Sequence, residues 1–326
     1  MRICVLGKRG SIVGWMEGVV MAWRRAGHLV MPAIFRDPRL HPRLERMLFS
    51  PRIGEPAAAA LLRRVRAFAP DLIVAVDAFS TPLSLLERLR RAPGLPPLFG
   101  WVGDLFGDYA AERAPYFDAI GYTDSGLVSL HAERGLRAEA FYLPHAANAA
   151  LGAGAVPARP RRTDMVFVGN PTPLRLALLR QLRQPVALLG PGWGTLGDSV
   201  HEVQLRRVPL AGLGAVYRAH AAVLNIRNET HVLAGLNQRN FDPFLCGAAV
   251  VSDRQPDLER CFDPKLEVAV WDEPAEVDAI SARLRCEPGW AAAMAERGRR
   301  RVLAEHTYAA RLETFARLAG VTVASQ

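Results

Sequence analysis

Cysteine is scarce in this sequence, and its few positions show no paired spacing. The 326 residues include four cysteines, Cys4, Cys246, Cys261 and Cys286, which lie far apart along the chain. A disulfide framework or a structural zinc site requires cysteines at closer, repeated spacings. We therefore expect reduced thiols and a cytoplasmic protein.

Long apolar runs and a secretory leader are also missing. The N-terminal residues MRICVLGKRG are not followed by the apolar segment of a signal peptide. No apolar run reaches the roughly 20 residues that a membrane-spanning helix needs. The sequence therefore predicts neither secretion nor a membrane span.

Lysine is almost absent, although the chain is basic. Two lysines accompany 39 arginines, and the formal net charge is +9. Residues 1–150 contain 19 basic and 14 acidic residues, an excess of five basic residues. Residues 151–326 contain 22 basic and 18 acidic residues, an excess of four. Proteins that bind nucleic acid usually concentrate basic charge on one element. The even spread argues against a nucleic-acid partner.

One segment does combine arginines with apolar side chains. Residues 35–52, FRDPRLHPRLERMLFSPR, place several arginines among leucine, methionine and phenylalanine. A basic amphipathic segment suits an acidic acceptor or anionic lipid headgroups, which allows peripheral contact with the inner face of a membrane. Pro38 and Pro42 interrupt a helix there, so an irregular surface segment is the alternative.

Short apolar runs alternate with helical patterns along almost the whole chain. Strands are expected at residues 2–7, 28–34, 71–77, 97–104, 119–124 and 139–146, and again at 163–170, 185–190, 221–228, 248–253 and 267–271. Strands that are apolar on both faces indicate a parallel sheet covered by helices on both sides. Repeated strand–helix–strand units predict an α/β protein with doubly wound, Rossmann-like sheets.

The stretch ANAALGAGAVPARPRR, which ends at residue 162, is the best candidate for a linker. It is rich in small residues, glycine and proline, and it has no helical or strand periodicity. We expect a Rossmann-like domain at 1–150, a linker at 151–162 and a second Rossmann-like domain at 163–305, with a ligand cleft between the domains. Residues 306–326 are expected to form a helix that packs back on the first domain.

The stretch GLNQRNFDPFLCGAAVVSD, residues 235–253, places polar side chains where a ligand would bind. It follows an expected strand, and a helix is expected to begin near Asn237. Ligands of parallel sheets lie at the carboxyl ends of the strands, where helix N-termini favour phosphate. Gly235 allows close approach of the backbone, Arg239 would neutralise charge, and Asp242 would accept hydrogen bonds from sugar hydroxyls. A solvated helix start with an asparagine cap is the alternative.

Ordered motifs in the second half of the chain carry a family resemblance. They are MVFVGNPTPLR, LGPGW, VYRAHAAVLNIRN, GLNQRNFDPFLCGAAVVSD, LERCFDPKLEVAVWDEP and HTYAARLETF. Together they cover most of residues 163–316 and resemble GT-B-fold glycosyltransferases of the retaining group 1 kind, most closely the branch of the spore-maturation protein CgeB. The first half matches more loosely, through GKRGSIVGWMEGVVMAWRRAGHLV, WVGD and YLPHAAN.

The resemblance implies a bacterial hexosyltransferase with a nucleotide-sugar donor, such as a UDP-sugar, held by the second domain. The first domain would hold an acceptor of unknown identity, which could be a glycan, a lipid or a protein. The implied donor-binding residues are Gly10, Asn170, Arg175, Trp193, Asn225, Arg227, Gly235, Leu236, Asn237, Arg239 and Asp242. Among them, the segment 235–237 would cradle the diphosphate with backbone N–H groups, and Asp242 would contact the ribose.

One position departs from the family pattern. Ala234 lies eight positions before Asp242, where the larger family has a glutamate that contacts the donor sugar. The sugar, and activity itself, therefore stay open. No Asp-x-Asp motif follows a strand, so neither a metal ion nor another cofactor is expected, and N–H groups and arginines would stabilise the leaving diphosphate. Retention of configuration is expected; an inverting reaction would use Asp104 or His145 as its base.

Two other functions fit the same fold. A nucleotide-sugar epimerase is one, although such chemistry usually needs carboxylates around the sugar, and Ala234 argues against it. A non-catalytic protein that binds a nucleotide sugar is the other. The segment 192–197 also fits the G-x-G-x-x-G pattern of dinucleotide sites, but no acidic residue follows near positions 210–220. A loop beside the nucleotide base fits better, with Trp193 either in the core or stacked on the base.

Overall fold

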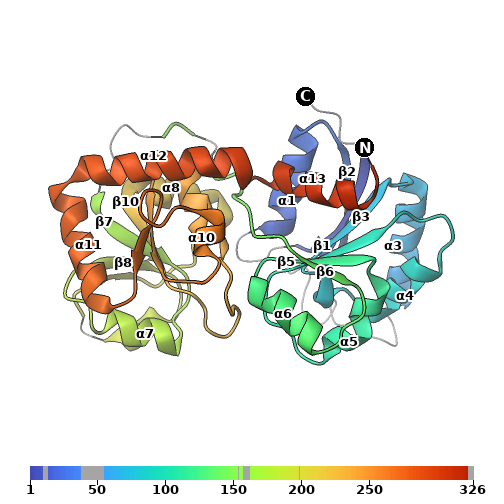
Figure 1. Cartoon of the computed structure of the whole chain (residues 1–326), viewed down its shortest axis with the longest axis horizontal. Coiled ribbons are helices and arrows are strands. Elements are labelled where there is room, and N and C mark those ends of the chain that lie inside the picture. Colours follow the sequence, from blue (N-terminus) through green and yellow to red (C-terminus); the bar gives the residue numbers. More distant parts are fainter. Residues whose placement is uncertain (10–13, 38–54, 153, 157–161, 198, 322–326) are drawn as a thin grey trace. The chain divides into compact units, whose positions relative to one another are not determined.

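Each half of the chain folds around one parallel β-sheet of six strands. The computed structural model describes residues 1–9, 14–37, 55–152, 154–156, 162–197 and 199–321. The chain divides into unit 1, formed by Met1–Pro144 with Tyr308–Gln326, and unit 2, formed by His145–Thr307. Figure 1 labels the elements of both units, and each unit is described by itself.

The sheet of unit 1 has the strand order β2-β1-β3-β4-β5-β6. Its strands are β1 (Arg2–Lys8), β2 (Leu29–Arg36), β3 (Leu72–Val76), β4 (Leu98–Val102), β5 (Ala119–Tyr122) and β6 (Glu139–Tyr142). Every residue of β3, β4 and β5 is buried, which explains why these runs are apolar on both faces. The chain places β2 on one side of β1 and then adds β3 to β6 on the other side.

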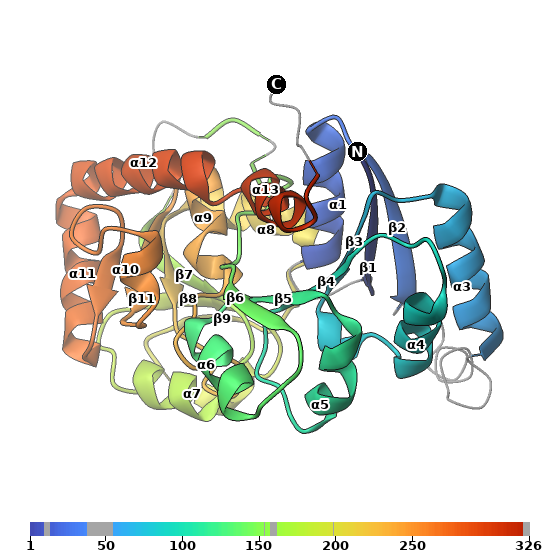
Figure 2. The ribbon, with the colours of Figure 1, turned by 45° about the vertical axis from the view of Figure 1, so that its right-hand side comes forward.

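Helices cover both faces of this sheet. They are α1 (Trp15–Arg25), α3 (Glu55–Phe68), α4 (Leu83–Arg91), α5 (Tyr109–Arg113), α6 (Ser125–Glu133) and α13 (Tyr308–Leu318), with 3₁₀ turns η1 (Ala78–Ser80) and η2 (Ala114–Tyr116). The core on one face joins side chains of α3, α4, α5 and α6 to the sheet. Figure 2 shows β1 and β2 between α1 and α3.

The other face of this sheet is covered by α1 and α13. The Trp101 ring lies 5.0 Å from that of Trp15 and 5.8 Å from that of Phe315. The Trp23 indole N–H donates to the backbone oxygen of Tyr308 at 2.7 Å. A helix from the end of the chain therefore completes the core of unit 1.

The sheet of unit 2 has the strand order β12-β11-β10-β7-β8-β9. Its strands are β7 (Arg162–Val168), β8 (Val186–Leu189), β9 (Glu202–Gln204), β10 (His220–Asn225), β11 (Ala249–Asp253) and β12 (Ala269–Trp271). The short edge strand β9 is not among the expected strands, because its three residues show no apolar pattern. The chain adds β8 and β9 on one side of β7 and then places β10 on the other side.

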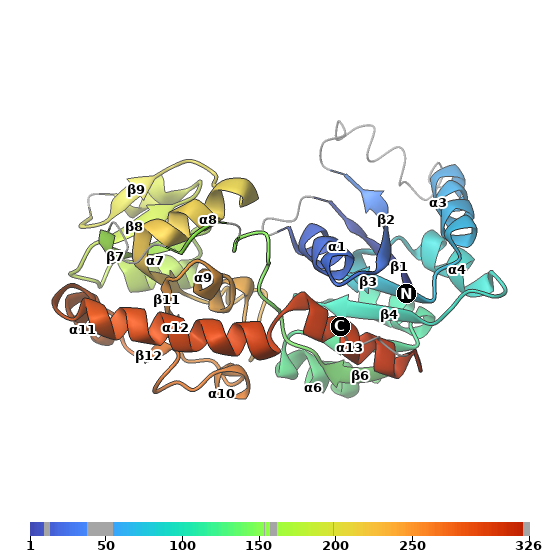
Figure 3. The same ribbon diagram turned by 90° about the horizontal axis from the view of Figure 1, so that it is seen from above.

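The helices of unit 2 also cover both faces. They are α7 (Pro173–Leu179), α8 (Leu210–Ala219), α9 (Asp242–Leu245), α10 (Leu258–Cys261), α11 (Pro274–Cys286) and α12 (Pro288–Glu305), with 3₁₀ turns η3 (Trp193–Leu196) and η4 (Gln238–Asn240). One face packs against α7, α11 and the start of α12, and the other packs against α8 and α9. Figure 3 shows α12 running alongside α9 and β11.

The predicted α/β class with two doubly wound parallel sheets is confirmed. The helix expected from Asn237 is wrong in its extent, since the structure has a three-residue 3₁₀ turn followed by the four-residue α9. Pro243 explains the break, because its missing N–H cannot continue a helical hydrogen-bond series. Gly247 then ends the segment with a φ of 78°.

Two sequence predictions fall partly or wholly outside the described residues. Gly10 lies outside them, and so does the basic segment 35–52 from residue 38 onward. Within the described part of the chain, no helix has both the length and the apolar character needed to cross a bilayer.

Candidate functional site

The carboxyl ends of β7 and β10 form the topological switch point of the sheet in unit 2. In open parallel sheets, the crevice at such a point is where ligands bind. β7 ends at Val168 and β10 ends at Asn225, and the two strands are direct neighbours. The site is therefore built from the residues that follow these two strands.

Arg239 connects the ends of both strands. Its guanidinium donates to the carbonyl oxygen of Val168 at 3.2 Å, to that of Ile226 at 3.5 Å and to Asn225 Oδ1 at 3.1 Å. The side chain comes from η4, the turn that replaces the expected helix start. These bonds hold a partly buried positive charge at the switch point.

Arg175 brings a second guanidinium to the same place. It is 4% exposed and lies in the first turn of α7. It donates to the Ile226 carbonyl oxygen at 3.2 and 3.0 Å and to that of Asn170 at 2.8 Å. The guanidinium carbons of Arg175 and Arg239 lie 5.1 and 4.9 Å from the centre of the Phe167 ring. Two arginines thus share one aromatic ring and one carbonyl oxygen.

The electrostatics of this pair favour an anion. Burial lowers the pKa of Arg175, and the positive charge of Arg239 lowers it further, while Glu229 and Asp253 oppose the shift. Burial also lowers the pKa of Arg239. A depressed arginine pKa means that the charged form is penalised where it stands. A bound anion would relieve that penalty, so the pair is suited to a phosphate or diphosphate.

Asn225 is the centre of a buried polar network behind the arginines. Its Oδ1 accepts from Asn237 Nδ2 at 2.9 Å and from Arg239 Nε. Its Nδ2 donates to Asn240 Oδ1 and to Ser252 Oγ, both at 3.2 Å. The network holds the turn Gln238–Asn240 in a fixed position against the ends of β10 and β11.

The segment 235–240 offers backbone N–H groups beside this network. The Asn237 side chain caps η4 by accepting from the Arg239 N–H at 2.9 Å, and the Asn237 N–H donates to Asn240 Oδ1 at 3.1 Å. Among the described residues, no hydrogen bond engages the backbone N–H of Gly235 or of Leu236. Those two groups are the ones left to meet a ligand, whereas the Asn237 N–H is already used.

Asp253 and Glu229 are two acidic residues of this region that the sequence analysis missed. Asp253 Oδ2 accepts from the Arg227 N–H at 3.2 Å, and Oδ1 accepts from Gln255 Nε2 at 2.9 Å. Burial raises the pKa of Asp253, and the Arg227 hydrogen bond and charge oppose that rise. Asp253 is the last residue of the apolar strand β11, and an acidic residue in that position was the sequence signal that could have identified it.

Glu229 binds the start of α7. Its carboxylate accepts from Thr172 Oγ1 at 2.9 Å and from the Leu174 N–H at 3.1 Å. Burial alone would raise the pKa of Glu229, but the Leu174 hydrogen bond and its other partners lower it. A carboxylate of the chain itself therefore occupies this helix terminus.

Two predicted donor contacts have buried side chains that face other parts of the protein. Trp193 is fully buried, with its ring 5.6 Å from that of Phe167 and its Nε1 donating to the Gly169 oxygen at 2.9 Å. Of the two alternatives for Trp193, a place in the core or stacking on the nucleotide base, the structure has the core position. Asp242 is 1% exposed and accepts from the Asn148 N–H at 2.7 Å.

The remaining predicted residues are spread over both units. Asn170 is exposed and follows β7, and Arg227 is partly exposed and follows β10. Asp104 is exposed after β4 in unit 1, whereas His145 is 9% exposed and belongs to unit 2. Among the described residues, no group of three histidine, cysteine, aspartate or glutamate side chains could hold a metal ion.

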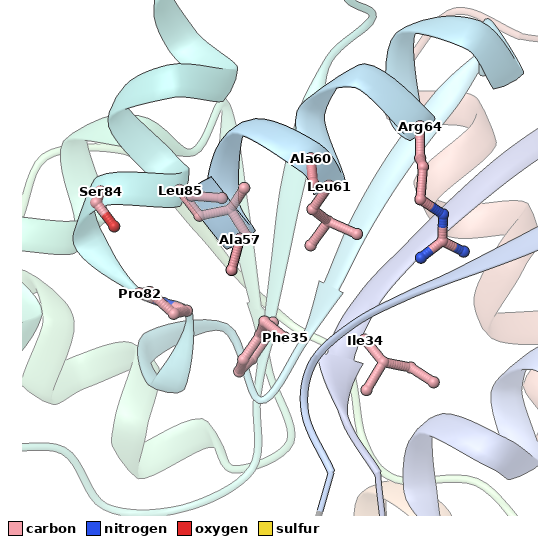
Figure 4. Close-up of a pocket in the computed structure, with 10 residues that line it drawn as sticks. Ile34, Phe35, Ala57, Ala60, Leu61, Arg64, Pro82, Ser84 and Leu85 are labelled. Carbon is pink, nitrogen blue, oxygen red and sulfur yellow. The ribbon is translucent and has the colours of Figure 1, made fainter. Parts of the chain in front are cut away.

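Unit 1 contains a separate apolar cavity of about 240 Å³. It is lined by β2, by α3 and by the start of α4, as Figure 4 shows; the residues are Ile34, Phe35, Ala57, Ala58, Ala60, Leu61, Arg64, Pro82, Ser84 and Leu85. Phe35 and Leu85 belong to the main hydrophobic core of this unit. The cavity is therefore a gap at the edge of that core, without a cluster of chemically reactive groups.

Comparison with known sequences identifies the domain that contains the arginine pair. The family described as glycosyl transferase-like matches residues 174–317. The protein carries a glycosyltransferase domain. The matched range includes Arg175, Asn225 and Arg239, whereas Asn170 lies before its start. The match is to the broad family, so it does not distinguish the CgeB branch. Among curated proteins, none matches this chain.

Solved structures with the same fold are glycosyltransferases of GT-B architecture. HepE from Anabaena, in complex with UDP and glucose, has a TM-score of 0.68 at 15% identity, covering 98% of this chain and 99% of that chain. Sucrose-phosphate synthase from Thermosynechococcus elongatus has a TM-score of 0.62 at 13% sequence identity, and the match covers 98% of each chain. A DNA-modifying β-glucosyltransferase has a TM-score of 0.62 at 10% sequence identity, and the match covers 98% of this chain and 100% of that chain. The glycosyltransferase domain of this protein thus lies within a chain that has the GT-B fold throughout.

Proposed function

We propose that the protein transfers a sugar from a nucleoside-diphosphate donor, of which a UDP-sugar is the best candidate, to an acceptor. The observation that carries the proposal is the pair formed by Arg175 and Arg239 at the switch point of unit 2. A diphosphate placed there would meet two guanidiniums and the N–H groups of Gly235 and Leu236. UDP is chosen because similar structures contain UDP or a UDP-sugar.

The proposed chemistry needs stabilisation of the leaving diphosphate more than it needs a protein nucleophile. As the glycosidic bond of the donor breaks, negative charge grows on the β-phosphate. Arg175 and Arg239 would neutralise this charge, which makes a metal ion unnecessary in the proposal. Transfer with retention follows the family resemblance, and the departing phosphate oxygen could then take the proton of the acceptor hydroxyl.

Titration of the purified protein with UDP, ADP and GDP tests the donor site. We expect saturable binding of UDP that persists with EDTA. Incubation with UDP-glucose should then release UDP and glucose slowly, as a transferase does without its acceptor. Isomerised UDP-sugar would support the epimerase alternative, and binding without turnover would support the non-catalytic alternative. No binding of any nucleoside diphosphate would overturn the proposal.

The stereochemical part has its own test. Once an acceptor supports turnover, proton NMR of the fresh product gives the anomeric configuration. Retention is expected, with Asp104→Asn and His145→Gln leaving the configuration unchanged. An inverted product would contradict the proposal and would make Asp104 and His145 the first residues to test as bases.

A further inference from the structure

The chain passes between its two units twice, and the two passages are bonded to each other. It enters unit 2 after Pro144 and leaves it after Thr307. The Ala147 N–H donates to the His306 oxygen at 2.9 Å, and Ala147 and Thr307 form a parallel β-bridge. On the side of unit 1, Arg311 Nε donates to the Pro144 oxygen at 2.8 Å. The start of unit 2 is thus paired with the end of the same unit.

Asp242 ties the first passage to the rest of unit 2. Its Oδ1 accepts the Asn148 N–H at 2.7 Å across a separation of 94 residues. Asn148 is 0% exposed and Asp242 is 1% exposed, so this bond is shielded from water. A hydrogen bond between a buried carboxyl and a buried amide is costly to leave unmade.

The same short segment reaches the donor site and both passages. Arg239 and Asp242 lie three positions apart, and hydrogen bonds from Asn240 N to Asn237 O and from Phe241 N to Gln238 O, both 3.0 Å, make the segment between them compact. The Phe241 ring lies 5.4 Å from the His306 ring. A shift of Arg239 on binding an anion would therefore be felt at residues 147–148 and at His306.

We propose that Asp242 is a positioning residue that latches residues 145–148 to the turn holding Arg239, so that donor binding orders the first passage between the units. This role differs from a contact with the ribose of the donor. The coupling to the donor rests on the proposed function, whereas the latch itself does not. The coupling to donor binding can therefore fail while the latch itself holds.

Hydrogen exchange measured by mass spectrometry on peptides covering residues 145–151 tests the latch without any ligand. Asp242→Ala should speed exchange of this segment by about tenfold. Asp242→Asn, which keeps an oxygen acceptor for the Asn148 N–H, should stay close to the wild type at pH 6.5. Unchanged exchange in Asp242→Ala would overturn the latch.

Asp278→Ala is a matched control in the same unit. The Asp278 carboxylate also accepts backbone N–H bonds across a long separation, from Arg183 at 3.0 Å and from Gln184 at 2.9 Å, but it lies away from both passages. This variant should leave exchange at 145–151 unchanged. Equal acceleration in both alanine variants would mean a general loss of stability and would also overturn the latch.

The pH dependence separates a latch from a passive structural bond. Burial raises the pKa of Asp242 to about 8, and the Asn148 N–H opposes the rise. The titratable groups that interact with it are Tyr217 of α8 and Cys246 at the end of α9. Because burial is what raises this pKa, deprotonation favours a state in which the Asp242 carboxylate is exposed to water and the latch is open. At pH 9 the wild type should exchange faster at 145–151 than Asp242→Asn; equal rates would contradict the proposal.

UDP distinguishes the latch from a ribose contact. In the wild type, UDP should slow exchange at 145–151, and in Asp242→Ala that effect should disappear. The ratio of affinities for UDP and 2′-deoxy-UDP should be the same in Asp242→Asn as in the wild type. A ratio that collapses in this variant would assign Asp242 to the ribose instead. If the wild type does not bind UDP, the donor proposal fails while the ligand-free exchange result still decides the latch.

Discussion

Arg175 and Arg239 donate hydrogen bonds to the same acceptor, the carbonyl oxygen of Ile226, at 3.0 and 3.5 Å. The two residues come from separate segments, one from α7 after β7 and the other from the turn after β10. Like charges repel, and contacts with the strand ends, the Phe167 ring and Asn225, together with the nearby carboxylates of Glu229 and Asp253, offset that repulsion. Such a pair suits an anionic ligand like the proposed diphosphate.

Removing one arginine of this pair should weaken nucleotide binding. Arg239→Ala deletes a charge-assisted contact to the diphosphate, which we expect to cost about 1–3 kcal/mol of UDP binding free energy. Isothermal titration calorimetry measures this loss. Arg297→Ala is the control, because Arg297 also donates to a backbone oxygen, that of Leu266, but on the exposed side of α12. Equal affinities in all three proteins would remove Arg239 from the site.

The buried carboxyl of Asp242 should make the stability of the protein depend on pH. Its pKa is raised from 3.8 to about 8, so the folded state binds a proton that the unfolded state has released between these values. The free energy of unfolding should therefore fall as the pH rises from 4 to 8, with a slope of at most about 1.4 kcal/mol per pH unit. Urea unfolding of the wild type and Asp242→Asn checks this, since the substitution should remove that component. Parallel pH profiles for the two proteins would show that the carboxyl does not titrate in this range.

Gly190 should not tolerate any side chain. It has a φ of 150°, and a Cβ there would lie 2.1 Å from the Gly169 carbonyl oxygen at the end of β7. Gly190→Ala should lower the free energy of unfolding by about 3 kcal/mol or more, since backbone strain and a backbone clash combine. Gly135→Ala, just after α6, is the comparison, because Gly135 has a positive φ of 58° but no atom within 4 Å of the added Cβ. Its cost should stay near 1 kcal/mol; similar melting temperatures for both variants would refute the argument.

The cavity in unit 1 should accept a larger side chain. Ala60→Leu on α3 adds apolar volume to a gap of about 240 Å³ beside Phe35 and Leu61. We expect a gain of about 1 kcal/mol in unfolding free energy, visible as a higher melting temperature. Ala67→Leu, at an exposed position of the same helix, should change stability little. Destabilisation by Ala60→Leu would mean that the cavity is not free for a side chain.

Several members of the candidate site could be predicted because they follow apolar strands. Asn170 and Arg227 lie just past the ends of β7 and β10, Asn225 is the last residue of β10, and Arg239 stands in a polar cluster between two strands. Asp253 escaped this reasoning because it was counted as the last residue of a strand, and Glu229 because it lies in a loop without a pattern. Trp193 and Asp242 were predicted as donor contacts but are buried, because the residue type does not tell whether a side chain points outwards or into the core.

The sequence by itself determined the α/β class and the two parallel sheets, because runs that are apolar on both faces require helices on both sides of a sheet. It also located β7 and β10, although their expected ends at residues 170 and 228 lie two and three positions beyond the observed ends at Val168 and Asn225. Only the tertiary structure decided that Arg175 and Arg239 share one carbonyl oxygen and that Asp242 is bonded to Asn148. Those contacts join residues 51, 13 and 94 positions apart. Such pairings depend on strand order and side-chain direction, which no local pattern specifies.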